Sequence, residues 1–207
     1  MIEQGTEAWH QQRLGKATAS RIADIVAKTK TGWGASRANY AAELVCERLT
    51  GTRTEGFTNA AMAFGTENEP FARTAYEFRH DVTVDLASFI DHPCIEMSGA
   101  SPDGFVGADG LIEIKVPNSA THIQTLLAGT IPEKYRLQMA WQMACTGRQY
   151  CDFVSFDPRL PEEMKLFVCR FERDDILIGQ LEREVEIFLG EVDDTIKRLR
   201  NQYAEAA

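Results

Sequence analysis

The sequence lacks a long apolar run and a basic, apolar start. Its first residues, "MIEQGTEAWHQQ", have none of the features of a signal peptide, and no segment approaches the ~18 apolar residues of a membrane-spanning helix. Tracts rich in proline and serine are missing too, while 44% of residues are hydrophobic and 26% are charged. We therefore expect a globular, cytoplasmic protein that has no membrane partner.

Cysteine is scarce and scattered. The five cysteines are Cys46, Cys94, Cys145, Cys151 and Cys169, and none of them forms a C-x2-C pair with another. An odd, dispersed set of this kind argues against a disulfide framework and against a zinc or iron-sulfur site. We expect reduced thiols that lie mostly in the core.

Positive charge is in deficit over most of the chain. The net charge of -9 argues, taken alone, against nucleic acid as a partner. Residues 1–40 are the exception, with six Lys/Arg against three acids, so they carry +3 and the other residues carry -12. A locally basic surface on an acidic protein is therefore possible.

The chain of 207 residues is long enough for one domain with a full hydrophobic core. Helical patterns dominate residues 1–80, and short β-branched segments dominate residues 81–173, interrupted by a helix between Pro132 and Gly147. A long acidic helix over residues 174–200 should face solvent. This order predicts a mixed α/β or α+β domain with a central mixed β-sheet flanked by helices.

Several local features of the helical region are also predicted. Thr18 or Ser20 is expected to cap a helix in "TASRIADIVAK", and "KTKTGWGAS" is expected to be a mobile basic loop. Ser36 should begin the next helix and Gly51 should end it. A further helix should run from about residue 59 to residue 80. The expected buried side of the helix that begins at Ser36 comprises Tyr40, Leu44, Val45 and Leu49.

The segment "SPDGFVGADGLIEIKVP" carries the candidate chemistry. In "LIEIKV" the two-residue period places Glu113 and Lys115 on one face and the aliphatic residues 112, 114 and 116 on the other. The aliphatic face can be buried while the charged pair stays at a surface or cleft. Taken alone, "EIK" fits an ordinary ion pair, and "SPDG" is a common β-turn sequence.

Together the two motifs predict a metal site. A hairpin would bring Asp103 beside Glu113, and two adjacent carboxylates repel each other unless a cation lies between them. The two carboxylates, the backbone carbonyl of Ile114 and water suit a hard ion such as Mg²⁺. Lys115 could then hold the attacking water, whose pKa the metal lowers.

"PD", nine further residues and "EIK" resemble the PD-(D/E)XK nuclease signature. The likeness extends to "EQGTEAWHQQRLGKATAS", "AFGTENEPFAR" and "YRLQMAWQMACTG", in an order similar to that of the YqaJ-like, lambda-exonuclease type of phage recombination nuclease. This resemblance implies a restriction-endonuclease-like core. It also adds Glu69 and Gln138 to the active site, although each alone would pass as a surface residue.

The resemblance further implies that Arg13 and Ser20 grip the 5'-phosphate of a DNA end, which suits a fork-shaped cation and a hydroxyl at a helix start. Met62 matches an apolar wedge position, although it equally fits ordinary helix packing. Two departures stand out. After the lysine, only His122 is available where the family often has a basic residue, and residues 59–62 lack a lysine that some relatives have.

The implied function is a Mg²⁺-dependent 5'-to-3' exonuclease on double-stranded DNA, with Mn²⁺ able to substitute. It would release mononucleotides and leave a single strand for recombination. The resemblance also implies a ring of three identical chains and a single-strand annealing protein as a partner. An endonuclease on the same core and a non-catalytic DNA-end binding protein remain as alternatives.

Overall fold

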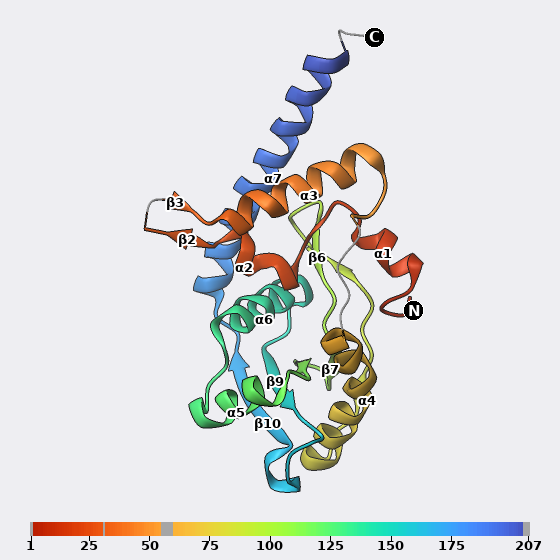
Figure 1. The fold of residues 1–207 in the computed structure, drawn as a ribbon, viewed down its shortest axis with the longest axis vertical. Coiled ribbons are helices and arrows are strands. Elements are labelled where there is room, and N and C mark those ends of the chain that lie inside the picture. The colour runs from red at the N-terminus through yellow and green to blue at the C-terminus, as the bar shows by residue number, and fades with distance from the viewer. Residues whose placement is uncertain (1, 31, 55–59, 205–207) are drawn as a thin grey trace.

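The computed structural model describes residues 2–30, 32–54 and 60–204, and it is built around a five-stranded mixed sheet (Figure 1). The strand order is β10-β9-β8-β7-β4. β8 pairs in parallel with β9 and antiparallel with β7, so it lies at the centre of the sheet. The strand bounds are β4 Val84–Asp85, β7 Gly104–Val106, β8 Gly110–Lys115, β9 Tyr150–Phe156 and β10 Leu166–Glu172.

Helices cover both faces of this sheet. α4 (Ala60–His80) packs against the face that carries Ile112 and Ile114, and α6 (Glu133–Thr146) packs against the opposite face. Both faces of β8 are therefore buried. The expectation that Glu113 would lie at a surface or cleft is wrong, because α6 covers its side of the strand and leaves Glu113 0% exposed.

A second layer of helices lies beyond α6. The larger hydrophobic cluster joins α6 to helices α2, α3 and α7, and α3 and α7 run side by side (Figure 1). A three-stranded sheet of order β1-β6-β5 lies beside them, and it brings the first segments of the chain next to the segment that precedes β7. The bounds are α1 Glu7–Arg13, α2 Ile22–Ile25, α3 Ala35–Thr50, α7 Asp175–Ala204, β1 Ala17–Thr18, β5 Ile90–Asp91 and β6 Ser98–Ala100.

The acidic helix α7 is amphipathic, and only one of its sides faces solvent. Val185, Phe188 and Val192 are fully buried in the larger cluster, so the expectation of a solvent-facing helix is wrong for this side. The apolar residues recur at helical spacing between the acids, which is the pattern of a helix on a core. Its last turns extend beyond the rest of the described chain (Figure 1).

Some predicted boundaries hold and others do not. Gly51 ends α3 in the left-handed conformation, with φ of 66°, as expected of a glycine at this position. The helix begins at Ala35, the residue before Ser36. Leu49 is 41% exposed, so it does not belong to the buried side of α3.

Two segments differ from the sequence-based expectation in type. The predicted basic loop contains a short antiparallel pair, β2 (Lys28–Thr29) with β3 (Gly32–Trp33). Helix α5 (Ser119–Ala128) was not predicted. Its start is fixed by the side chain of Asn118, whose oxygen accepts a hydrogen bond from the N–H of Thr121 at 2.9 Å.

All five cysteines are free thiols, as expected. Cys145 and Cys151 are buried, as expected. Cys46 and Cys94 are exposed, so the prediction that the cysteines lie in the core is wrong for Cys46 and Cys94. None of the helices in the described ranges is long and apolar enough to cross a membrane.

Candidate active site

The predicted hairpin brings Asp103 to the central strand. β7 and β8 pair antiparallel with Gly104 opposite Ile112, so Asp103, which precedes β7, lies next to the end of β8. Its carboxylate Oδ2 accepts a hydrogen bond from the backbone N–H of Ile114 at 2.6 Å. Asp103 therefore lies beside Ile114, the residue that follows Glu113, as the spacing of the two motifs predicts.

Glu113 is held by three side chains. Gln138 donates a hydrogen bond from Nε2 to Oε1 of Glu113 at 2.7 Å, and Gln142 donates from Nε2 to Oε2 at 2.6 Å. Lys115 forms an ion pair with Oε1. Since Glu113 is fully buried, these contacts replace the water that a carboxylate otherwise needs.

The position of α6 explains why two glutamines serve one carboxylate. Pro132 precedes the helix, and Gly147 ends it in the left-handed conformation with φ of 71°. Every residue from 138 to 145 is buried, because α6 lies between the sheet and the outer helices. Gln138 and Gln142 are four residues apart and therefore project from the same side of the helix, toward Glu113.

The electrostatics of the cluster favour a cation. Burial, and then the nearby carboxylate of Glu113, raises the pKa of Asp103 well above its ordinary value. Burial alone would lower the pKa of Lys115, but Glu113 and Asp103 outweigh it and raise this pKa, so Lys115 stays protonated. The single positive charge of Lys115 thus interacts with two carboxylates that repel each other.

Glu69 on α4 contributes a third acid to the neighbourhood. Its side chain is partly buried, whereas Glu67 is exposed. Burial raises the pKa of Glu69, Arg73 and Lys115 oppose the rise, and Glu113 adds to it. The charges of Lys115 and Glu113 therefore both affect the pKa of Glu69, so Glu69 lies near the cluster.

The donor set fits a hard divalent ion that keeps part of its water. In the described ranges, no three His, Cys, Asp or Glu side chains are arranged to hold a metal on their own. Asp103 and Glu113 supply two carboxylates, and the carbonyl of Ile114 lies in the strand segment that they flank. Mg²⁺ commonly binds through one or two carboxylates together with water and substrate phosphate, so these residues fit Mg²⁺.

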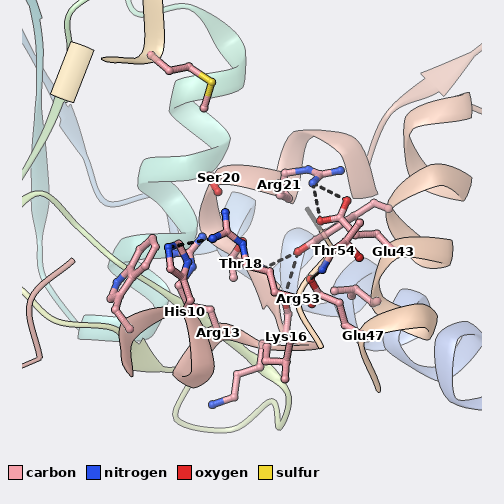
Figure 2. Close-up of a pocket in the computed structure, with 15 residues that line it drawn as sticks. His10, Arg13, Lys16, Thr18, Ser20, Arg21, Glu43, Glu47, Arg53 and Thr54 are labelled. Carbon is pink, nitrogen blue, oxygen red and sulfur yellow. Dashed lines mark hydrogen bonds and ion pairs between the residues drawn. The ribbon is translucent and has the colours of Figure 1, made fainter. Parts of the chain in front are cut away.

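Arg13 and Ser20 line one pocket, a cavity of about 350 Å³ between α1, α3 and the segment that joins β1 to α2 (Figure 2). Arg13 lies 4.0 Å from the ring centre of Trp9 and donates a hydrogen bond from Nη1 to Oγ of Ser101 at 3.1 Å. Burial lowers the pKa of Arg13 to about 10. An anion in this pocket would offset the cost of burying that charge.

The predicted helix cap holds in position for Thr18 and not for Ser20. Thr18 occupies the N-cap position of a 3-10 turn, Ala19–Arg21, although its side chain makes no cap hydrogen bond, and Ser20 lies within that turn. α2 has only four residues. Ser20 is exposed at the pocket, so it can contribute through its hydroxyl group and not through a helix N-terminus. Met62 also lines the pocket and is 54% exposed.

Ser101 links the pocket to the segment that contains Asp103. Besides Arg13, Nε1 of Trp9 donates to Oγ of Ser101 at 3.0 Å, and Ser101 precedes Asp103 by two residues. Sequence reasoning missed Ser101, Trp9 and Gln142. The four-residue spacing of Gln142 from Gln138 was a signal for the last of these, but no local pattern pointed to the other two.

His122 does not supply a basic group near the site. It is fully buried, and its Nδ1 and Nε2 contact Oγ of Ser155 at 2.7 Å and the carbonyl of Met164 at 2.8 Å. The carbonyl requires a donor at Nε2, so the ring serves as a structural link between α5, β9 and the segment before β10.

The fold and the cluster together define a class. A mixed sheet whose central strand carries a glutamate and a lysine, with an aspartate just before the neighbouring strand and helices on both faces, is the PD-(D/E)XK, restriction-endonuclease-like core. The model of the YqaJ-like viral recombinase domain matches residues 8–149. The chain belongs to this family.

Solved structures agree with this assignment. The alkaline exonuclease LHK-Exo from Laribacter hongkongensis is 53% identical, with a TM-score of 0.92 over 98% of this chain and 100% of that chain. A structure of LHK-Exo in complex with dAMP matches equally well. A phage-related exonuclease from Haemophilus somnus 129PT, 16% identical with a TM-score of 0.71, covers 89% of this chain and 96% of that chain and shares the fold. Comparison with curated protein sequences gives no match.

Proposed function

We propose that the chain is a Mg²⁺-dependent nuclease that digests double-stranded DNA from a 5'-phosphorylated end, in the 5'-to-3' direction. The observation that carries this proposal is the hydrogen bond between Arg13 and Ser101, which ties the arginine pocket to the segment of Asp103. Family membership and the 53% identity to an alkaline exonuclease support a nuclease. The dAMP bound by LHK-Exo supports a mononucleotide product.

Asp103, Glu113 and the carbonyl of Ile114 would hold the metal. A bound Mg²⁺, or Mn²⁺ in its place, lowers the pKa of a water molecule and offsets negative charge on the phosphate. Gln138 supports this role by fixing the Oε1 atom of Glu113. Glu69 belongs to the same site as a nearby acid.

Lys115 acts as a hydrogen-bond donor in the reaction. Its raised pKa keeps the ammonium charged, so it orients the attacking water and stabilises charge on the phosphate as the water oxygen bonds to phosphorus. The bond to the 3'-oxygen breaks, and that oxygen takes up a proton. The remaining strand then begins with a new 5'-phosphate, which is the group that the pocket binds.

The short link between pocket and site supports release of single nucleotides. Two residues of chain span at most about 7 Å, so the backbone of Ser101 lies within that distance of the backbone of Asp103. One DNA strand rises about 3.4 Å per nucleotide. A terminal phosphate bound by Arg13, which contacts Ser101, would therefore lie close to the proposed metal site, and this supports cleavage near the first nucleotide.

One experiment tests the class of activity. Linear and closed circular duplex DNA are incubated with the protein in Mg²⁺ or in EDTA. The proposal predicts mononucleotides from linear DNA in Mg²⁺ only. Cleavage of the circle would favour an endonuclease, and binding of ends without any cleavage would favour a non-catalytic end-binding protein.

The assembly and the partners are also part of the proposal. We infer a closed ring of three chains around the duplex, because enclosure would keep a protein with a net charge of -9 on a polyanion. The single strand that digestion leaves is the substrate of a single-strand annealing protein, which is the proposed protein partner.

A further inference from the structure

A second arginine lines the pocket that contains Arg13. Arg53 follows the left-handed turn at Gly51 that ends α3, and its Nη1 lies 3.0 Å from Nε2 of His10. His10 belongs to α1, as Arg13 does, so the two arginines reach the pocket from segments 40 residues apart in the sequence. Figure 2 shows the contact between Arg53 and His10 beside Arg13.

Two other cations of the pocket are paired with carboxylates. Arg21 pairs with Asp24 at 2.6 Å and with Glu43 at 2.9 Å, and Lys16 pairs with Asp91 at 2.6 Å. Arg21 and Lys16 are therefore less available to a ligand than an arginine without a carboxylate partner.

Arg13 and Arg53 differ from these two. Within the described ranges neither has a carboxylate partner, since Arg13 bonds to the hydroxyl of Ser101 and Arg53 to the imidazole of His10. Nε2 of His10 must accept this hydrogen bond and is therefore unprotonated. Burial, and then Arg53, lowers the pKa of His10, which agrees with a neutral ring.

A buried carboxylate ties the two arginine-bearing segments together. Oε2 of Glu47 accepts a hydrogen bond from the N–H of Gly15 at 2.8 Å, and Oε1 accepts one from the N–H of Thr54 at 3.1 Å. Gly15 follows Arg13 by two residues, and Thr54 follows Arg53 directly. Both oxygens of Glu47 thus accept hydrogen bonds from the backbone. These two hydrogen bonds fix the positions of the segments that carry Arg13 and Arg53.

We propose that Arg53 is a second phosphate-binding residue, which makes this pocket specific for a terminal phosphate monoester. This inference rests on the proposed 5'-phosphate site. A monoester carries about -1.5 to -2 charge at pH 7, whereas an internal phosphodiester carries one negative charge. Two guanidinium groups that have no carboxylate partner among the described residues match the monoester, and each can form a charge-assisted, fork-shaped contact with it.

The test compares duplexes that differ only in having a 5'-phosphate or a 5'-hydroxyl. Binding is measured by fluorescence anisotropy in EDTA, which prevents turnover, for wild type, Arg53→Gln, Arg53→Lys and Arg13→Gln. We expect Arg53→Gln to reduce the preference for the phosphorylated end about tenfold or more, as for loss of a hydrogen bond to a charged group. Arg53→Lys should retain part of the preference, because it keeps the charge without the fork.

The matched control is Arg198→Gln, which removes one exposed arginine from α7, outside the pocket. It should leave the preference unchanged. If wild type shows no preference for the phosphorylated end, the proposed 5'-phosphate site itself is wrong. If Arg13→Gln loses the preference while Arg53→Gln keeps it, or if Arg53→Gln weakens both ends equally, only the assignment of Arg53 is overturned.

Discussion

Gln142 donates a hydrogen bond from Nε2 to Oε2 of Glu113 at 2.6 Å, one helical turn after Gln138 has engaged Oε1. Both oxygens of a fully buried carboxylate are therefore fixed by neutral amides of one helix. Groups that orient a metal ligand in this way tune its position and its basicity. Glu113 is thus positioned by α6 as much as by its own strand.

Gln142→Leu should weaken metal binding. Leucine has a similar volume, but it leaves Oε2 of Glu113 without its amide donor. Loss of such an orienting group typically lowers metal affinity or activity about 10- to 100-fold. Isothermal titration with Mn²⁺ measures the affinity directly. The matched control is Gln124→Leu on the exposed side of α5, which should bind as wild type does; equal affinity in all three proteins would contradict the role of Gln142.

Lys115→Ala should abolish cleavage while metal binding persists. The lysine is assigned to the water and the phosphate, and its removal takes a positive charge away from the two carboxylates, which should not weaken their hold on a cation. Turnover is measured at saturating Mg²⁺ on 5'-phosphorylated linear duplex, and metal binding is measured by titration.

Asp103→Ala is the comparison for this variant. It removes a carboxylate of the metal site, so cleavage and metal binding should both be lost. A Lys115→Ala protein with turnover close to that of wild type would remove the proposed mechanism.

The site was predictable where its residues are close in sequence. Asp103, Glu113 and Lys115 lie within 13 residues, and a turn sequence plus a two-residue period is enough to place them together. The depth of Glu113 was not predictable, because it depends on α6, which begins 20 residues later. An alternating strand looks half-exposed until the element that covers its polar face is known.

The pocket shows the same limit. Ser101 meets Arg13 only because β1 pairs with β6, an arrangement that links residues about 80 apart. Arg53 reaches His10 through a turn whose direction is set by Gly51 and whose end is held by Glu47. In α7 the apolar residues do recur at helical spacing in the sequence. The many acidic residues between them led to the prediction of a solvent-facing helix. These contacts are tertiary, so no local pattern encodes them.

Asp157 should make folding sensitive to acid. Burial alone would raise the pKa of Asp157, but hydrogen bonds from Arg159 and Ser119 outweigh it and hold this pKa at about 2. A carboxyl group whose pKa is lowered in the folded state stabilises the fold above its unfolded pKa of about 3.9, and the stabilisation is lost as pH falls toward 2. Arg159 also donates to the carbonyl of Pro117, just beyond Lys115, at 3.2 Å.

Urea unfolding at pH 5 and at pH 2.5 measures this effect. Arg159 is 46% exposed, so solvent screens the pair and the expected contribution is roughly 1 to 2 kcal/mol. Wild type should lose that much more free energy of unfolding between the two pH values than Asp157→Asn does. Identical losses in the two proteins would show that the ion pair does not stabilise the fold.

The oligomeric state is the next prediction. The chain carries -9, with +3 in residues 1–40 and -12 in the remainder, so its affinity for DNA cannot come from a uniformly basic surface. In a ring, the basic region and the metal sites would line the channel, and the acidic side of α7 would face outward. Charge on the outer surface is largely screened beyond ~8 Å at physiological salt, so attraction inside the channel prevails. Sedimentation equilibrium should give three times the chain mass of 23.2 kDa.

Enclosure also has a kinetic consequence. A closed ring stays linked to its substrate even where single contacts are weak, and head-to-tail interfaces between identical chains readily close into such rings. End-labelled duplex is digested after initiation in the presence of a large excess of unlabelled DNA, and digestion should continue on the molecules already engaged. A monomer or dimer at working concentration would rule out the ring. A trimer whose digestion stops as soon as competitor is added would show that enclosure does not confer processivity.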